Sequence, residues 1–242
     1  MTSRGYKSKT GDDDEVILSF DDCLLRKSDV NLLKGPFWLN DAIIGFYFTY
    51  LEKSTHTFED NGYDKIRGKV KYFSPEITQF LKMVKSVSEC SMMLDCVITK
   101  DIQFIFFPLN DCQKYDDAGG THWSLLVYSN PEDKFFYLDS MKSDYNRSMA
   151  KSFANGINEY LITNNLKNTQ STSMSFKDIQ CPQQTNGYDC GVFVLTYAEI
   201  ILQHVKSNLK VEGCNFSNVN KLVSSQRSKL LTLIDDLKNK DS

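Results

Sequence analysis

A cysteine with the surroundings of a nucleophile lies late in this chain. Cys190 stands between Asp189 and Gly191, where a polar loop gives way to the apolar run 192–195. A thiolate is the reactive form, and a helix N-terminus stabilises it because unpaired N–H groups and the helix dipole favour negative charge. We expect Asp189 to cap this helix and Gly191 to keep the approach to the sulfur open. The alternative is a buried cysteine that only opens a core helix, since free cysteine is among the most buried residue types.

Two predicted strands bring a histidine and an aspartate together. Residues 122–128 and 134–140 are largely apolar runs of strand length, separated by the turn signal 130–133. Strands of equal length joined by a short turn place His122, which begins the first, beside Asp139, which ends the second. The alternative for each is a structural role, with His122 bonded to a loop and Asp139 opening a turn.

Together these residues predict nucleophilic catalysis by a cysteine. His122 can act as the general base toward Cys190, and Asp139 can fix the tautomer of His122. The tetrahedral intermediate needs hydrogen-bond donors for its oxyanion, and the backbone N–H of Cys190 and the side-chain amide of Gln184 are candidates. Gln183 is the alternative donor, but the spacing to Cys190 favours Gln184.

The same sequence predicts the elements that must position these groups. Helices are predicted over 42–52, 75–84, 88–94, 144–164, 191–204 and 218–238, with a short helical turn at 28–33. Strands are predicted over 16–20, 102–109, 122–128 and 134–140, and an edge strand is indicated at 173–176. Asn40 or Asp41 can cap the first long helix, and Ser74 followed by Pro75 opens the next. These elements predict an α+β fold with a central antiparallel sheet flanked by helices.

Composition argues against several classes of function. The chain has 242 residues and a net charge of −3, which suits one domain with a sizeable core and gives no basic face for nucleic acid. Residues 1–15 predict a polar tail without a secretory signal, and 16–242 a single domain. Apolar runs are of strand length, so no membrane span is predicted. His56 is expected in a polar loop over 52–71 and His204 at the exposed end of a helix.

The cysteines indicate thiol chemistry and not a metal centre. There are seven, an odd number, and their spacing does not match zinc sites; the chain has only three histidines. We therefore expect reduced thiols, as in the cytoplasm or nucleus, and no metal or other cofactor.

Four motifs in chain order resemble those of the Ulp/sentrin-type cysteine proteases, which process ubiquitin-like modifiers. The motifs are Trp38-Leu39-Asn40-Asp41, His122-Trp123-Ser124, Asp139-Ser140 and Gln184-Thr185-Asn186-Gly187-Tyr188-Asp189-Cys190-Gly191. The resemblance covers about residues 16–238. It implies a papain-like α+β fold in which the catalytic residues follow in the order His, Asp, Cys, whereas papain-like enzymes place Cys before His.

Within that family the chain looks most similar to the deneddylase branch, which removes the Nedd modifier. The stretches that carry this similarity are 28–33, 38–46, 74–80 and 119–128. The implied activity is cleavage after the C-terminal Gly-Gly of the modifier, in precursor processing, deconjugation or both. The implied partners are the modifier and its conjugates, cullins among them, and the implied state is a monomer. A SUMO-specific protease, an acyltransferase with the same triad and an inactive modifier-binding module are the alternatives.

The resemblance also implies substrate-binding roles. Trp38 and Trp123 would form the roof and floor of a narrow channel that passes only residues without a Cβ. The local alternative for Trp38 is a hydrophobic staple ahead of the helix cap. Asp41 resembles an acid that contacts a basic residue of the modifier's tail. The loop 110–117, which begins at Asn110, resembles a mobile loop that closes over the bound modifier.

Overall fold

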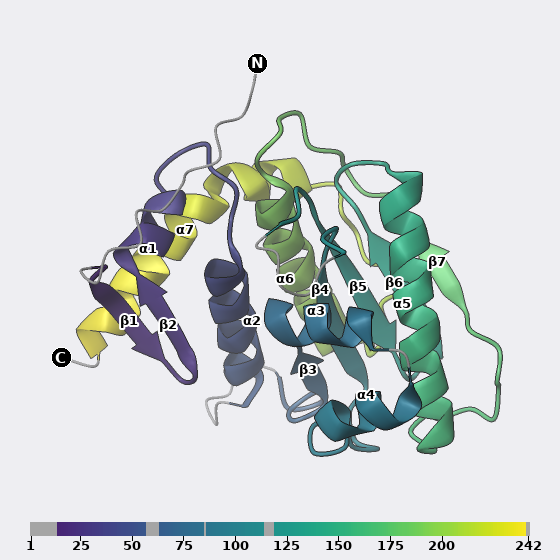
Figure 1. Ribbon diagram of the computed structural model, residues 1–242. Helices are drawn as coiled ribbons and strands as arrows, with labels where there is room; N and C mark the ends of the chain where they lie inside the picture. Colours follow the sequence, from purple (N-terminus) through teal and green to yellow (C-terminus); the bar gives the residue numbers. More distant parts are fainter. Residues whose placement is uncertain (1–13, 57–62, 85, 114–118, 241–242) are drawn as a thin grey trace.

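A mixed five-stranded sheet forms the centre of the structure, a computed structural model that describes residues 14–56, 63–84, 86–113 and 119–240 (Figure 1). Its strands, in spatial order, are β3 (Val70–Tyr72), β4 (Phe104–Asn110), β5 (Trp123–Ser129), β6 (Lys134–Leu138) and β7 (Phe176–Asp178). A separate two-stranded sheet consists of β1 (Val16–Phe20) and β2 (Cys23–Arg26). The helices are α1 (Lys27–Leu32), α2 (Asp41–His56), α3 (Pro75–Met83), α4 (Val87–Leu94), α5 (Asp144–Thr163), α6 (Cys190–Asn208) and α7 (Val219–Lys240).

The central sheet is not purely antiparallel, which corrects the prediction. Strands β4, β5 and β6 are mutually antiparallel as expected, but β3 and β7 run parallel to their neighbours. Parallel pairs need a long crossover, and helices supply it: α3 and α4 lie between β3 and β4 in the chain, and α5 lies between β6 and β7. Strands β2 and β3 were not predicted, and β7 begins where the predicted edge strand ends, because runs of three or four residues give almost no alternation to detect.

Helices cover both faces of the sheet. In β4 the side chains alternate, so that Phe104 and Phe106 pack with α2, α6 and α7 while Ile105 and Phe107 pack with α3, α4 and α5. Figure 1 shows α3, α4 and α5 on one side of the sheet and α6 on the other. Burying a phenylalanine side chain stabilises a fold by about 1.5–3 kcal/mol. The central strands are therefore a rigid base for the residues at their ends.

The helix starts follow the predicted caps. Asn40 accepts a hydrogen bond from the backbone N–H of Ile43 at 3.2 Å, ahead of α2. Ser74 accepts one from Ile77 at 3.4 Å, with Pro75 in the first helical position of α3. Each side chain satisfies an N–H that has no partner within its own helix.

Two histidines lie in helices that run further than predicted. Helix α2 continues to His56, which is its exposed last residue and not part of a loop. Helix α6 continues to Asn208, so His204 lies inside it, and the Asn208 side-chain amide donates to the His204 carbonyl at 2.9 Å. Packing of the apolar helix faces against the sheet extends both helices beyond the point where the sequence turns polar.

The predicted polar tail lies outside the described residues except at its end. The carboxylate of Asp14 accepts from the Ser28 backbone N–H at 3.1 Å and also from the Ser28 hydroxyl. The Lys27 N–H donates to the Glu15 carbonyl at 2.9 Å. Asp14 and Glu15 are therefore bound to the start of α1. No helix of the described segments is long and apolar enough to cross a membrane.

Candidate active site

A histidine–aspartate pair lies at one end of the central hairpin. His122 immediately precedes β5 and Asp139 immediately follows β6, and the register of the two strands pairs Leu125 with Leu138. The Nε2 atom of His122 is 2.6 Å from Oδ1 of Asp139, and both side chains are buried. The pairing predicted from hairpin geometry is confirmed. The carboxylate holds the proton on Nε2, which leaves Nδ1 as the basic atom of the neutral ring.

Three donors hold the Asp139 carboxylate in place. Oδ1 accepts hydrogen bonds from Nε2 of His122 and from the backbone N–H of Met141, the latter at 2.8 Å. Oδ2 accepts a hydrogen bond from the Tyr137 hydroxyl at 2.9 Å. Tyr137 was missed from the sequence. Its position two residues before Asp139 is the spacing of one strand face, and this signal could have identified it. A carboxylate fixed in this way can orient an imidazole without moving itself.

Cys190 is the first residue of α6 and is 2% exposed. Burial alone would lower the pKa of His122, but hydrogen bonds and charge interactions with Asp139 and with Cys190 outweigh burial and raise the pKa to about 9. The Nδ1 atom of His122 is buried and makes no well-formed hydrogen bond with the described residues. Nδ1 is thus the atom placed to take the thiol proton. Cys190 is buried and also interacts with the His122 ring, and its role as the nucleophile stays a prediction.

This pKa predicts the alkaline limit of catalysis. An imidazolium beside the thiolate is needed to protonate the leaving amine, and it is lost as the pH rises through about 9, not through the ordinary value of 6.5. We expect kcat/KM for a fluorogenic modifier substrate to stay high through neutral pH and to fall near pH 9. The same sign applies to stability: the stabilising contribution of protonated His122 is complete below about pH 6.5 and is lost through about pH 9. An alkaline limb near pH 6.5, with the fold intact by circular dichroism, would contradict this assignment.

Asp189 does not cap α6, contrary to the prediction. It occupies the N-cap position with φ −97° and ψ 5°, and its side chain makes no hydrogen bond to the helix. Its Oδ1 atom instead accepts from Arg227 of α7 at 2.8 Å, and its Oδ2 atom accepts from Asn186 at 2.8 Å. An ion pair across the fold has replaced the local cap. The first N–H groups of α6 are therefore not occupied by this carboxylate and can face a negative charge at Cys190.

Gly191 also has a different role from the one expected. A Cβ atom built on Gly191 would lie 3.0 Å from Cβ of Leu39. The space beside this glycine is filled by the segment ahead of α2, so the residue does not keep an open approach to the sulfur. Its lack of a side chain lets the start of α6 pack closely against Leu39.

The two glutamines ahead of Cys190 are bonded differently. The Gln183 side-chain amide donates to two backbone carbonyls, that of Asp139 at 3.0 Å and that of Cys181 at 3.1 Å, which uses both of its N–H groups. The Gln184 amide donates to the Asn186 carbonyl at 2.6 Å, and its oxygen accepts from a serine hydroxyl, that of Ser140, at 2.7 Å. Among the residues that the structure describes, the Gln184 amide makes this single donation, so its other N–H remains for an oxyanion, which favours Gln184 over Gln183.

The indole N–H groups of the two tryptophans donate to different segments. The indole N–H of Trp123 donates to the Leu39 carbonyl at 3.0 Å from within the core. The indole N–H of half-buried Trp38 donates to the Gly187 carbonyl at 2.6 Å. Gly187 belongs to residues 184–189, which we call the nucleophile loop. Leu39 is therefore hydrogen-bonded to the first residue of β5, and the adjacent Trp38 is hydrogen-bonded to the nucleophile loop.

The remaining predicted substrate-binding residues lie at element ends. Asp41 is the exposed first residue of α2. Desolvation by neighbouring protein atoms raises the pKa of the Asp41 carboxyl, and the charge of the nearby Glu76 carboxylate raises it further. Asn110 ends β4, and its Oδ1 atom accepts from the Cys112 backbone N–H at 2.8 Å. Gly120 has φ +103°, and a Cβ there would lie 1.9 Å from Oδ1 of Asn110, so only glycine fits. Residues 114–117 of the predicted mobile loop lie outside the described residues.

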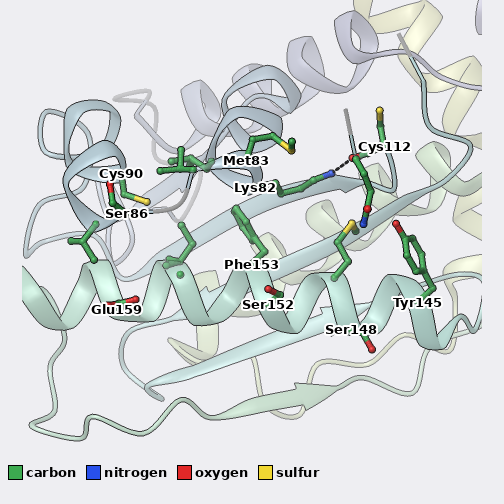
Figure 2. Close-up of a pocket in the computed structure, with 17 residues that line it drawn as sticks. Lys82, Met83, Ser86, Cys90, Cys112, Tyr145, Ser148, Ser152, Phe153 and Glu159 are labelled. Carbon is green, nitrogen blue, oxygen red and sulfur yellow. Dashed lines mark hydrogen bonds between the residues drawn. The ribbon is translucent and has the colours of Figure 1, made fainter. Parts of the chain in front are cut away.

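A pocket of about 550 Å³ lies away from this site, between α5 and the α3–α4 pair (Figure 2). Lys82 is one of the lining residues, and it donates to the Cys112 carbonyl at 2.9 Å and also to the Asn110 carbonyl (Figure 2). Burial lowers the pKa of Lys82 to about 8. No predicted catalytic residue lines this pocket, so its relevance to the site is indirect: Lys82 fixes the start of the loop that follows β4.

The fold and these side chains define a cysteine protease, with the base and its orienting acid on a hairpin and the nucleophile at a helix start. The model of the Ulp1 protease family, C-terminal catalytic domain, matches residues 37–229. This chain belongs to the Ulp1 protease family, and the prediction made from four motifs is confirmed. Within the described segments, no cluster of His, Cys, Asp or Glu could hold a metal ion.

Individual relatives agree with this assignment. Human "Sentrin-specific protease 8" is 38% identical over 192 residues, covering 79% of this chain and 83% of that protein. "NEDD8-specific protease 1" of Arabidopsis thaliana is 30% identical over 232 residues, covering 93% and 95%. The Ulp1 protease domain solved in complex with Smt3, the yeast ortholog of SUMO, superposes with a TM-score of 0.66 at 20% identity, covering 94% of this chain and 90% of that one. The structural likeness supports the α+β fold.

Proposed function

We propose that this protein cleaves after the C-terminal Gly-Gly of a ubiquitin-like modifier and prefers the Nedd modifier. The observation that carries the chemistry is the 2.6 Å pair of His122 and Asp139 set against buried Cys190 at the start of α6. The preference is supported by the names of two relatives, the human sentrin-specific protease 8 and the NEDD8-specific protease 1 of Arabidopsis thaliana.

The reaction proceeds through an acyl-enzyme. His122 takes the proton of Cys190, and the thiolate attacks the carbonyl carbon of the modifier's last glycine. The resulting oxyanion accepts hydrogen bonds from the Cys190 N–H and the free N–H of the Gln184 amide. Collapse of this tetrahedral intermediate breaks the C–N bond between the modifier's last glycine and the leaving amine, and the amine takes its proton from His122. His122 then deprotonates a water molecule, which hydrolyses the thioester and releases the modifier with a free carboxylate.

Substrate selection comes from the surroundings of the nucleophile. Trp38 and Trp123 border a channel that admits glycine and rejects residues with a Cβ. The bond from the Trp38 indole to the nucleophile loop supports this role over that of a hydrophobic staple. Asp41, with Glu76 nearby, presents negative charge to a basic residue of the modifier's tail. Asn110 shapes the neck of the loop that closes over the modifier.

The proposal also covers the partners, the oligomeric state and the cellular location of the protein. The partners are the modifier, its precursor and its conjugates, with cullins among the conjugates and no nucleic acid or membrane involved. The protein acts as a monomer in the cytoplasm or nucleus, and residues 16–242 act as one catalytic domain. No cofactor is needed, because the thiol, the imidazole and the carboxylate supply the whole reaction.

A panel of three probes tests the modifier preference. Nedd, SUMO and ubiquitin probes, each carrying an electrophile in place of the terminal carboxylate, are incubated with the protein, and adduct formation is followed by mass spectrometry. We expect the fastest adduct with the Nedd probe, at Cys190. Fastest reaction with SUMO would identify a SUMO-specific protease, and no adduct with any probe would identify a binding module. A Nedd probe with both terminal glycines replaced by alanine is the matched control and is expected to react far more slowly.

A further inference from the structure

One arginine near the end of the chain contacts both segments that frame the nucleophile. Arg227 lies on α7, and its Nη2 atom donates to Oδ1 of Asp189 and to the carbonyl of Phe37, each at 2.8 Å. Its Nη1 atom donates to the Leu32 carbonyl at 2.8 Å. The guanidinium carbon is 5.9 Å from the ring centroid of Tyr188, and the side chain is 16% exposed. These partners surround a planar cation on several sides.

The partners of Arg227 are the immediate neighbours of catalytic and substrate-binding residues. Asp189 directly precedes Cys190, and Phe37 directly precedes Trp38. A single guanidinium therefore joins the nucleophile loop to the segment ahead of α2. A lysine could not do this, because its ammonium is a point charge without the planar fork that binds several acceptors at fixed angles.

The ion pair between Arg227 and Asp189 also changes the electrostatic environment of the Cys190 sulfur. Asp189 is negative and precedes the thiol, so by itself it would oppose formation of a thiolate. Arg227 neutralises this carboxylate and turns it away from the helix, where it makes no capping hydrogen bond. The N-terminal N–H groups of α6 then remain for the thiolate and the oxyanion.

We propose that Arg227 is a positioning residue for catalysis: through Asp189 it keeps the start of α6 open to negative charge, and through Phe37 it sets the place of Trp38 relative to Cys190. The second half of this inference rests on the proposed function, since it concerns the modifier's tail. The first half does not, because it concerns the reactivity of the thiol itself.

Two readouts test the two halves separately. The rate of Cys190 alkylation by iodoacetamide, followed by mass spectrometry of its peptide across pH, reports the thiolate without any modifier. Replacing Arg227 by alanine is expected to slow alkylation at neutral pH and to move its pH profile to higher pH. Turnover of the Nedd substrate is expected to fall roughly ten- to hundredfold, as for the loss of charge-assisted hydrogen bonds. Lys221→Ala, an exposed cation on the same helix, is the matched control and should change neither.

Two further variants separate positioning from simple tethering of α7. Arg227→Lys keeps the charge but not the fork, so we expect alkylation to recover more than turnover does. In an Asp189→Asn background, Arg227→Ala is expected to affect alkylation much less, because no carboxylate is left to neutralise. Equal effects in the two backgrounds, or normal alkylation in a folded Arg227→Ala variant, would overturn the proposal. Failure of the wild-type protein to process any modifier would reject the proposed function and leave the alkylation test of Arg227 intact.

Discussion

Replacing Cys190 by alanine is expected to abolish cleavage of a fluorogenic Nedd substrate while leaving binding of the modifier largely intact. The sulfur forms the only covalent bond to the substrate in the proposed reaction, and loss of a nucleophile of this kind lowers kcat by about 10⁶-fold. The exchange removes one buried atom and leaves the His122–Asp139 pair in place. Turnover is measured by fluorescence and binding by calorimetry.

The matched control for this experiment is a second cysteine. Cys96 is a free, exposed thiol outside the site, and Cys96→Ala should retain full activity. Residual activity near the wild-type level in Cys190→Ala would show that another group is the nucleophile. Loss of binding together with turnover would instead indicate that the substitution disturbs the start of α6.

Replacing Asp139 by asparagine is expected to lower kcat by about 10³- to 10⁴-fold through the wrong tautomer of the base. Asp139 accepts from Nε2 of His122 at 2.6 Å, and an amide in its place can turn its N–H₂ group toward the ring and favour the proton on Nδ1. The neutral amide also removes the charge that helps to raise the pKa of His122. We therefore expect the alkaline limb of kcat/KM to move to lower pH as well.

A surface aspartate provides the control for the second substitution. Asp178 ends β7 and pairs with Arg147 at 2.8 Å on an exposed face, so Asp178→Asn should leave both rate and pH profile unchanged. The rate and the pH profile of Asp139→Asn are measured with the same substrate. An unchanged rate would mean that a different residue orients His122, and a reduced rate with an unmoved alkaline limb would separate positioning from charge.

The sequence alone was sufficient to predict the pairing of His122 with Asp139 and the position of Cys190 at a helix start. His122 and Asp139 lie on one hairpin, and a two-strand register is a short-range property that turn length and alternation determine. Cys190 at a helix start follows from the change from polar loop to apolar run. The caps at Asn40 and Ser74 are equally local, since a side chain bonds an N–H only three residues away.

Only the tertiary structure decided what each of these residues contacts across the fold. Asp189 has the sequence signature of a cap, yet it binds Arg227, 38 residues further along the chain. Arg227 itself lies in an ordinary surface-helix pattern and gave no signal of this contact. The parallel edge strands and the packing of Gly191 on Leu39 were likewise unforeseen. Local sequence sets the conformations available to a segment, but long-range packing chooses the partner, because an ion pair or close contact across the fold can outweigh a cap worth about 1 kcal/mol.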